Sequence, residues 1–208
     1  MLLRSIQSKD FRNSLLKFTY LHPDGIGLYW ASKFLYGKNG FKGKLNGTDL
    51  YFQILKSAIQ NKWKVFMYGG GFDDSIKVNR DIINSFEGLQ LAGLIPRFES
   101  VNEKILKKIN DSNSQILFVG LGSPSQEEFL TQYSSQINIP VQIAVGSGID
   151  FISGNYKRAP LVLRSIGLEW FYRLIKEPRR LWKRYLIGIP VFVFKILCFK
   201  VRLLLNKS

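Results

Sequence analysis

Cysteine and histidine are almost absent from this 208-residue sequence, which contains one of each, Cys198 and His22. A single cysteine cannot form a disulfide within the chain, and a single histidine excludes a metal site built from several His or Cys ligands. Acidic residues are also scarce, because 30 lysines and arginines stand against 15 aspartates and glutamates and leave a net charge of +15. The shortage of cysteine excludes a disulfide scaffold, and the charge indicates an anionic partner.

Long apolar runs are missing from the C-terminal part of the sequence. The longest uncharged stretch there, Tyr185–Phe194, has ten residues and contains Gly188 and Pro190. A helix needs about 20 apolar residues to span a bilayer. The N-terminus turns polar too soon for a signal peptide. We therefore expect no spanning helix, and we expect Leu181–Leu205 to lie on an anionic membrane surface.

Basic residues are concentrated near the C-terminus. Thirteen of them lie between Lys157 and Ser208 against only Glu169 and Glu177, a surplus of +11, whereas the rest of the sequence carries +4. Aromatic residues interleave with them, a pattern that fits either nucleic acid or a membrane surface. The apolar stretch that follows suits lipid or a partner protein better than a phosphate backbone, so nucleic acid is not the expected partner.

Apolar runs that alternate with helical patterns predict the fold class. Four short strands are predicted, at residues 63–68, 89–94, 116–119 and 141–145. This order predicts βαβ units and an α/β, Rossmann-like fold with a largely parallel sheet and flanking helices. We expect this core domain over residues 1–156 and a basic helical, membrane-docking appendage over 157–208. Within the appendage, residues 161–176 are predicted to form one helix.

Three glycine turns follow strands of the predicted sheet, at Gly69–Gly71, Gly120–Gly122 and Gly146–Gly148. They are expected to gather at the carboxyl ends of the strands, where ligands bind in such sheets. None of them reads G-x-G-x-x-G and no Walker lysine motif is present, so the dinucleotide and P-loop fingerprints are absent. The glycines predicted to contact a substrate at this edge are Gly70, Gly122 and Gly148.

The stretch Gln115–Glu128 joins a predicted buried strand to a helix through the second glycine turn. Ser123 is predicted to be the helix N-cap and Pro124 the first helical residue. Gln126 follows Ser123 at the spacing of a capping box, so it either caps its own helix or binds a sugar or uracil edge. The free N–H groups of such a helix end suit a phosphate or a sugar oxygen.

Two carboxylates stand in positions suited to chemistry. Asp24, in a Pro-Asp-Gly turn before a predicted helix, is placed to take a proton from an acceptor hydroxyl, although such an Asp also stabilises plain turns. Asp150 follows the third glycine turn and is either a second site carboxylate, a helix N-cap or an acceptor in a structural hydrogen bond to the turn. Four cations are either pyrophosphate partners or solvated surface charges: Lys44, Arg97, Lys157 and Arg158.

Several stretches together resemble the WecG/TagA/CpsF glycosyltransferases. In chain order from His22 to Arg184 they are HPDGIGLYWASK, LNGTDL, VFMYGGG, ILFVGLGSPSQEEF, VGSGIDFISG, KRAP and GLEWFYRLIKEPRRLWKR. The resemblance implies an inverting transfer, without metal or cofactor, from a UDP-sugar to an undecaprenyl-diphosphate-linked sugar. The implied donor sugar is N-acetylmannosamine or its uronic acid. The implied setting is the cytoplasmic face of the membrane, in the synthesis of teichoic acid, enterobacterial common antigen or capsule.

The resemblance also implies roles for single residues. Asp24 matches the aspartate of the family's D-G-I-G motif, which is implied to be the general base. Gln126 matches the glutamine of the P-x-Q-E motif. Lys44 stands where members often carry an arginine, which keeps the charge but loses the planar fork. The appendage arginines implied to reach the lipid diphosphate are Arg173, Arg179 and Arg184.

The N-terminal part departs from the family pattern. Only 23 residues precede Asp24, whereas members usually carry a longer N-terminal part with a Thr-x-Asn motif that is missing here. A non-catalytic, basic membrane-binding or scaffolding protein is therefore the alternative to the enzyme. The sequence leaves open which sugar is transferred and whether the protein is a homo-oligomer.

Overall fold

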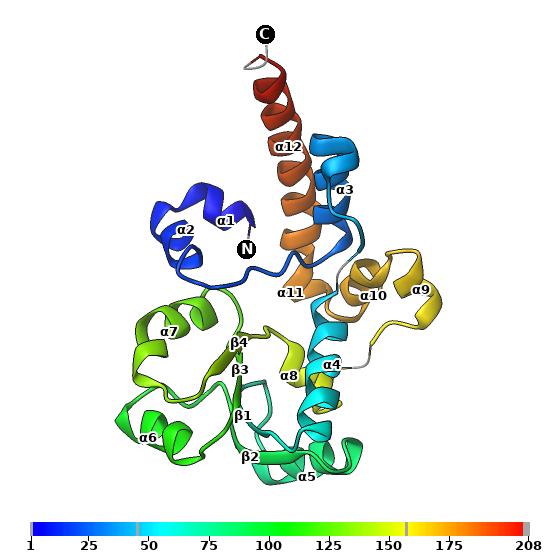
Figure 1. The fold of residues 1–208 in the computed structure, drawn as a ribbon. Helices are drawn as coiled ribbons and strands as arrows, with labels where there is room; N and C mark the ends of the chain where they lie inside the picture. The colour runs from blue at the N-terminus through cyan, green and yellow to red at the C-terminus, as the bar shows by residue number, and fades with distance from the viewer. Residues whose placement is uncertain (1, 45, 157, 206–208) are drawn as a thin grey trace. The chain divides into compact units, whose positions relative to one another are not determined.

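The computed structural model describes residues 2–44, 46–156 and 158–205 (Figure 1), and the side chains of Leu2, Leu3, Gln7, Arg180 and Arg184 lie outside this description. The chain divides into two compact units. The sheet unit comprises Met1–Leu21 and Gly47–Lys157, and the helical unit comprises His22–Asn46 and Arg158–Ser208. The helical unit thus joins the C-terminal segment to a stretch from the first quarter of the chain. The predicted domain division after residue 156 stays a prediction.

The sheet unit is built on a parallel sheet, which confirms the predicted α/β class. Within the described residues its strands run in the order β2-β1-β3-β4. Their bounds are β1 Lys64–Gly69, β2 Gln90–Ile95, β3 Ile116–Gly120 and β4 Val141–Ala144. The strand order reverses between β1 and β3, and the carboxyl ends of these two strands are therefore the point where ligands bind in such sheets.

Helices cover both faces of this sheet, with α6 and α7 on one side and α4, α5 and α8 on the other (Figure 1). Alternate residues of β1 serve the two faces, because Val65 and Met67 pack with one core cluster and Phe66 and Tyr68 with the other. Since both faces are covered, the central strands are continuous apolar runs. The bounds are α4 Gly47–Gln60, α5 Ser75–Ser85, α6 Glu103–Asp111, α7 Ser125–Tyr133 and α8 Gly148–Ile152.

Side-chain caps fix the starts of two of these helices. The Asp74 carboxylate accepts a hydrogen bond from the backbone N–H of Lys77 at 2.9 Å and so caps α5. Asn102 caps α6 in the same way. Two short N-terminal helices, α1 (Leu2–Gln7) and α2 (Lys9–Leu15), complete the sheet unit.

The helical unit contains α3, a 3₁₀ turn at Gly37–Asn39, and a chain of C-terminal helices. Their bounds are α3 Ile26–Tyr36, α9 Leu161–Ser165, α10 Glu169–Lys176, α11 Pro178–Trp182, a π-helical turn Lys183–Ile187 and α12 Gly188–Leu205. The prediction of one helix over 161–176 is wrong. Gly167 adopts φ +80° and separates α9 from α10, and a Cβ there would lie 2.6 Å from the Cδ1 of Ile26.

Helix α12 packs along α3. Lys200 anchors the pair, because its ammonium group donates to the carbonyl oxygen of Leu35 at 3.1 Å and lies over the ring of Phe34. Apolar side chains nevertheless remain exposed along α12, among them Phe194, Leu204 and Leu205. Of the helices in the described ranges, none combines the length and the apolar character that crossing a membrane requires.

Candidate functional site

The glycine turns after β1, β3 and β4 meet at the carboxyl ends of the strands, as predicted. Gly70 donates its backbone N–H to the carbonyl oxygen of Gly120 at 3.1 Å. A Cβ on Gly69 would lie 2.3 Å from the backbone of Gly120, and a Cβ on Gly120 would lie 2.9 Å from the carbonyl oxygen of Gly146. The turns are therefore in backbone-to-backbone contact, which only glycine permits.

The start of α7 differs from the prediction. The helix begins at Ser125, with Pro124 at the N-cap and no side-chain hydrogen bond to the cap, and the Ser123–Pro124 peptide is cis. The predicted Ser123 cap and the capping box with Gln126 are therefore wrong. The side chain of Gln126 has turned inward instead, where it is only 4% exposed.

Gln126 connects the second glycine turn to the third. Its Oε1 accepts the backbone N–H of Gly146 at 2.8 Å, and its Nε2 donates to Oε1 of Glu127 at 2.8 Å. The Gln126 amide is thereby held between the N–H of Gly146 and the carboxyl group of Glu127. No role was assigned to Glu127 from the sequence. In the structure its side chain is 1% exposed, and its Oε2 has no hydrogen-bond partner in the described part of the chain.

Asp150 connects the third glycine turn to the first. It lies in α8, is buried, and accepts the backbone N–H of Gly71 on Oδ1 at 2.7 Å. Ser147, not Asp150, stands at the N-cap of α8. Gln126 and Asp150 together therefore hold the three turns in one arrangement.

The three glycines predicted to contact a substrate differ in their surroundings. A Cβ on Gly70 would lie 2.5 Å from the ring of Phe72, and one on Gly148 would lie 2.7 Å from the ring of Tyr51. These two glycines are needed for packing within the sheet unit. Gly122, with φ +81°, would meet nothing within 4 Å. Of the three, it therefore leaves the most room for a ligand.

Asp24 belongs to the helical unit. Its side chain is exposed, and it precedes Gly25, which adopts φ +95° at the N-cap of α3. The next residue, Ile26, contacts the Gly167 turn between α9 and α10. Asp24 therefore lies at the end of α3 that packs against the C-terminal helices of its own unit.

Lys44 and its neighbour Asn46 approach the same turn. The ammonium group of Lys44 donates to the carbonyl oxygen of Ser165 at 3.5 Å, and the amide of Asn46 donates to Glu169 at 3.0 Å. The segment that carries Asp24 and Lys44 is thereby joined to the helices that carry the predicted arginines. This association depends on residues more than 100 positions apart in the sequence.

The arginines predicted to bind substrate also belong to the helical unit. Arg158 and Arg173 are half-buried, and Arg179 is exposed. The side chain of Arg184 lies outside the described side chains, and Lys157 lies outside the described residues. Their contacts with a substrate stay predictions.

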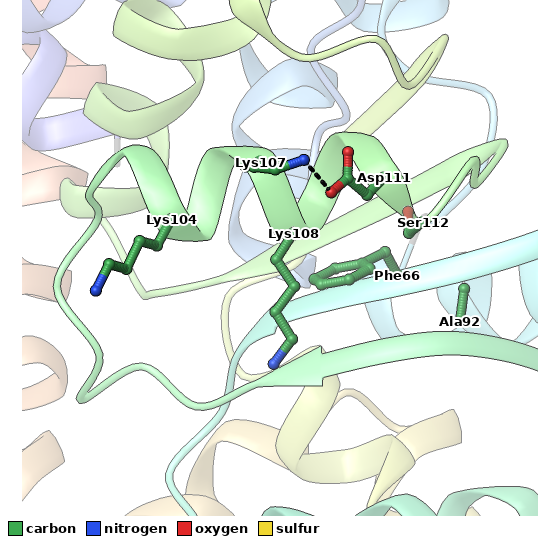
Figure 2. A pocket seen from close by; sticks show the side chains of 7 residues that line it. All are labelled: Phe66, Ala92, Lys104, Lys107, Lys108, Asp111 and Ser112. Carbon is green, nitrogen blue, oxygen red and sulfur yellow. Dashed lines mark hydrogen bonds and ion pairs between the residues drawn. The ribbon is translucent and has the colours of Figure 1, made fainter.

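A shallow hollow of about 420 Å³ lies in the sheet unit, between α6 and the edge strand β2 (Figure 2). Lys107 on its wall pairs with Asp111 at 2.7 Å. A neighbouring hollow touches Lys64 and Gln90, the first residues of β1 and β2. The neighbouring hollow therefore lies at the amino ends of these strands. The residues that line the hollow of Figure 2 are Phe66, Ala92, Lys104, Lys107, Lys108, Asp111 and Ser112.

The phenol of Tyr68, on β1, has a raised pKa. Burial raises the pKa of its phenol, and the nearby Glu99 and Tyr133 raise the pKa further. The hydroxyl donates to the carbonyl oxygen of Glu99 at 2.8 Å. Tyr68 thus ties the loop after β2 to the central strand.

Comparison with known proteins identifies relatives of the whole chain. The model of the Glycosyl transferase WecG/TagA/CpsF family matches residues 1–205. A protein of Bacillus subtilis (strain 168) is 32% identical over 193 residues, which cover 93% of this chain and 74% of the relative. A Bacillus spizizenii protein is 33% identical with the same coverage. A Staphylococcus aureus (strain MRSA252) protein is 29% identical over 86% of this chain and 68% of the relative. All three bear the name N-acetylglucosaminyldiphosphoundecaprenol N-acetyl-beta-D-mannosaminyltransferase.

Proposed function

Because the chain belongs to the WecG/TagA/CpsF family of glycosyl transferases, we propose that it moves N-acetylmannosamine, or its uronic acid, from a UDP-sugar to an undecaprenyl-diphosphate-linked N-acetylglucosamine. The relatives' shared name, which specifies this sugar and this acceptor, supports the proposal. The reaction belongs to the synthesis of a cell-surface polysaccharide such as teichoic acid or capsule.

The sheet unit binds the nucleotide in this proposal. The observation that supports it most is the meeting of the glycine turns at the carboxyl ends of β1 and β3, where the strand order reverses. Ligands of doubly wound sheets bind at this place. Gly122 leaves room there for a ligand. The N–H groups of Gln126, Glu127 and Glu128 at the start of α7 donate within the chain, to the carbonyl oxygens of Gly122 and Pro124.

Asp24 acts as the general base. Its carboxylate removes the proton from the acceptor sugar hydroxyl as that oxygen attacks the anomeric carbon of the donor. The bond from the anomeric carbon to the β-phosphate oxygen breaks, the electron pair stays on that oxygen, and UDP leaves. Attack from the face opposite the leaving group inverts the anomeric configuration. The exposure of Asp24 is consistent with access to an acceptor.

The helical unit binds the lipid-linked acceptor at the membrane surface. It carries 16 basic residues against 3 acidic ones, and Lys44, Arg158, Arg173, Arg179 and Arg184 are proposed to neutralise the lipid diphosphate. Exposed apolar side chains on α9 and α12 are proposed to enter the interface, with the basic residues facing anionic headgroups. The protein is then peripheral, on the cytoplasmic face.

A donor panel tests the proposal. The chain is mixed with N-acetylglucosaminyl-diphosphoundecaprenol in anionic vesicles and with UDP-sugars supplied singly, and the lipid product is measured by mass spectrometry. We expect product with UDP-N-acetylmannosamine or its uronic acid and none with UDP-glucose or UDP-N-acetylglucosamine. UDP binding without transfer from any donor would support the non-catalytic alternative instead.

A further inference from the structure

Arg97 lies at the carboxyl edge of the sheet, in the loop after β2. Its backbone N–H donates to the carbonyl oxygen of Gly70 at 3.1 Å, which anchors this loop to the first glycine turn. Its guanidinium lies against Gly71, where a Cβ would come within 2.6 Å of Nη2 and 2.9 Å of Cζ. The guanidinium therefore occupies the space that a side chain at position 71 would take.

Gly71 is glycine for reasons of space. Its φ lies outside the left-handed region, and the three atoms nearest to an added Cβ all belong to the Arg97 guanidinium. Its backbone N–H donates to Oδ1 of Asp150 at 2.7 Å, and this hydrogen bond fixes the backbone of the first glycine turn. Because Gly71 has no side chain, the Arg97 guanidinium can pack against the backbone of the first glycine turn.

The Arg97 side chain is exposed. Its guanidinium forms no ion pair with an acidic residue in the described ranges. Besides Gly71, the guanidinium contacts the ring of Phe98, whose centroid lies 5.4 Å from Cζ. Lys107 on α6 shows the contrast, because its charge is paired with Asp111. Arg97 therefore presents an array of N–H donors at the sheet edge where the strand order reverses.

We infer that Arg97 binds the diphosphate of the sugar nucleotide, and that Gly71 makes this possible by leaving room for the guanidinium. A planar guanidinium forms paired hydrogen bonds with phosphate oxygens, which an ammonium group does not. Charge accumulates on the β-phosphate oxygen as UDP leaves, so the same contact favours bond cleavage. This inference rests on the proposed function and names a further substrate-binding residue of that site.

Three variants test it. Arg97→Ala is expected to raise both the Kd of UDP and the KM of the UDP-sugar by about tenfold or more, because a charge-assisted contact is lost. Arg97→Lys keeps the charge but not the fork, and is expected to fall between Arg97→Ala and wild type. Gly71→Ala is expected to weaken UDP binding as Arg97→Ala does, because its methyl group displaces the guanidinium while the backbone accepts alanine.

The double variant separates this role from a structural one. If Gly71→Ala acts through the guanidinium, Gly71→Ala/Arg97→Ala binds UDP no more weakly than Arg97→Ala alone. Arg80→Ala, which removes an exposed arginine of α5, is expected to match wild type. Thermal unfolding of every variant shows whether lost binding reflects lost folding.

The outcomes distinguish the inference from the proposed function. Wild-type UDP affinity in Arg97→Ala and Gly71→Ala, with wild type itself binding UDP, overturns the inference alone. Equal weakening by Gly71→Ala in the presence and in the absence of Arg97 also overturns it. Absence of UDP and UDP-sugar binding to wild type overturns the proposed function and the inference with it.

Discussion

The two units of this protein differ in how they use apolar and charged residues. The sheet unit carries 14 basic and 12 acidic residues, whereas the helical unit carries 16 and 3. The sheet unit buries its apolar side chains in two clusters on either side of the sheet. In the helical unit, the described apolar side chains that are buried are only Ala31, Ala159 and Leu181.

This difference indicates that the sheet unit is stabilised by its own core, whereas the helical unit offers an exposed surface to a partner. The sheet unit has the core that a folded domain needs, and its turns are held by buried hydrogen bonds. The helical unit exposes many large apolar side chains beside an excess of basic residues, a combination that marks a surface for lipid or protein. We therefore expect changes in the sheet unit to affect stability and nucleotide binding, and changes in the helical unit to affect turnover and membrane binding.

The largest effect is expected from Asp24→Asn in the helical unit. Loss of the general base should lower kcat by about a thousandfold while UDP binding and the melting temperature stay near wild type. Asp10→Asn, which removes an exposed carboxylate of α2, serves as the control. Turnover close to wild type in Asp24→Asn would remove the assignment of Asp24 as the base.

The next effect concerns membrane binding by α12. Phe194 and Leu204 are 67% and 59% exposed, and their joint replacement by serine should weaken binding to anionic vesicles by about a hundredfold. UDP affinity should not change, because the sheet unit is untouched. Ile76→Ser is the matched control, since Ile76 is 76% exposed on α5 of the sheet unit. Equal losses in the two proteins, measured by vesicle sedimentation, would contradict the comparison.

A smaller effect is expected from Gln126→Ala in the sheet unit. The substitution leaves the partly buried N–H of Gly146 and the buried Oε1 of Glu127 without their partner. We expect the free energy of unfolding to fall by about 2 kcal/mol, measured by urea denaturation. Glu128→Gln changes the exposed neighbour and should cost almost nothing. Unchanged stability in Gln126→Ala would show that the hydrogen bonds of Gln126 to Gly146 and Glu127 contribute little to the free energy of unfolding.

The smallest effect is expected from Tyr68→Phe. Its hydroxyl bond to Glu99 contributes about 1 kcal/mol at neutral pH. Because folding raises the pKa of this phenol, the unfolded chain loses its proton first, and stability falls as the pH rises above about 10. Tyr68→Phe should flatten that fall in denaturation curves recorded from pH 8 upward. An unchanged slope would count against burial as the cause.

The strands and the glycine turns could be predicted from the sequence because local patterns determine them. A run such as Ile116–Val119 is apolar along its whole length because both faces of its strand are covered. The break at Gly167 was missed although its cause is local, because Gly167 adopts φ +80° after α9 and the N–H of Leu168 donates to the carbonyl oxygen of Leu163. The inward turn of Gln126 could not be predicted, because its partner Gly146 lies 20 positions away, after β4.

The sequence motifs named single candidate residues, but they did not predict which of these residues lie together. Motifs singled out Asp24 and Lys44, yet no local pattern joins them to the C-terminal helices. That association depends on contacts such as Asn46 with Glu169, 123 positions apart. In the sequence, Arg97 was one of four candidate pyrophosphate partners with nothing to distinguish them. The contact of its guanidinium with Gly71 distinguishes it in the structure.

The transfer reaction itself tests the central claim most directly. Wild-type protein is mixed with UDP-N-acetylmannosamine and vesicles containing N-acetylglucosaminyl-diphosphoundecaprenol, and the anomeric configuration of the lipid-linked disaccharide is determined by NMR. We expect a disaccharide whose new linkage has the configuration opposite to that of the donor. A product with retained configuration would contradict the mechanism at Asp24, and absence of product from this donor and from the corresponding uronic acid would contradict the proposed function.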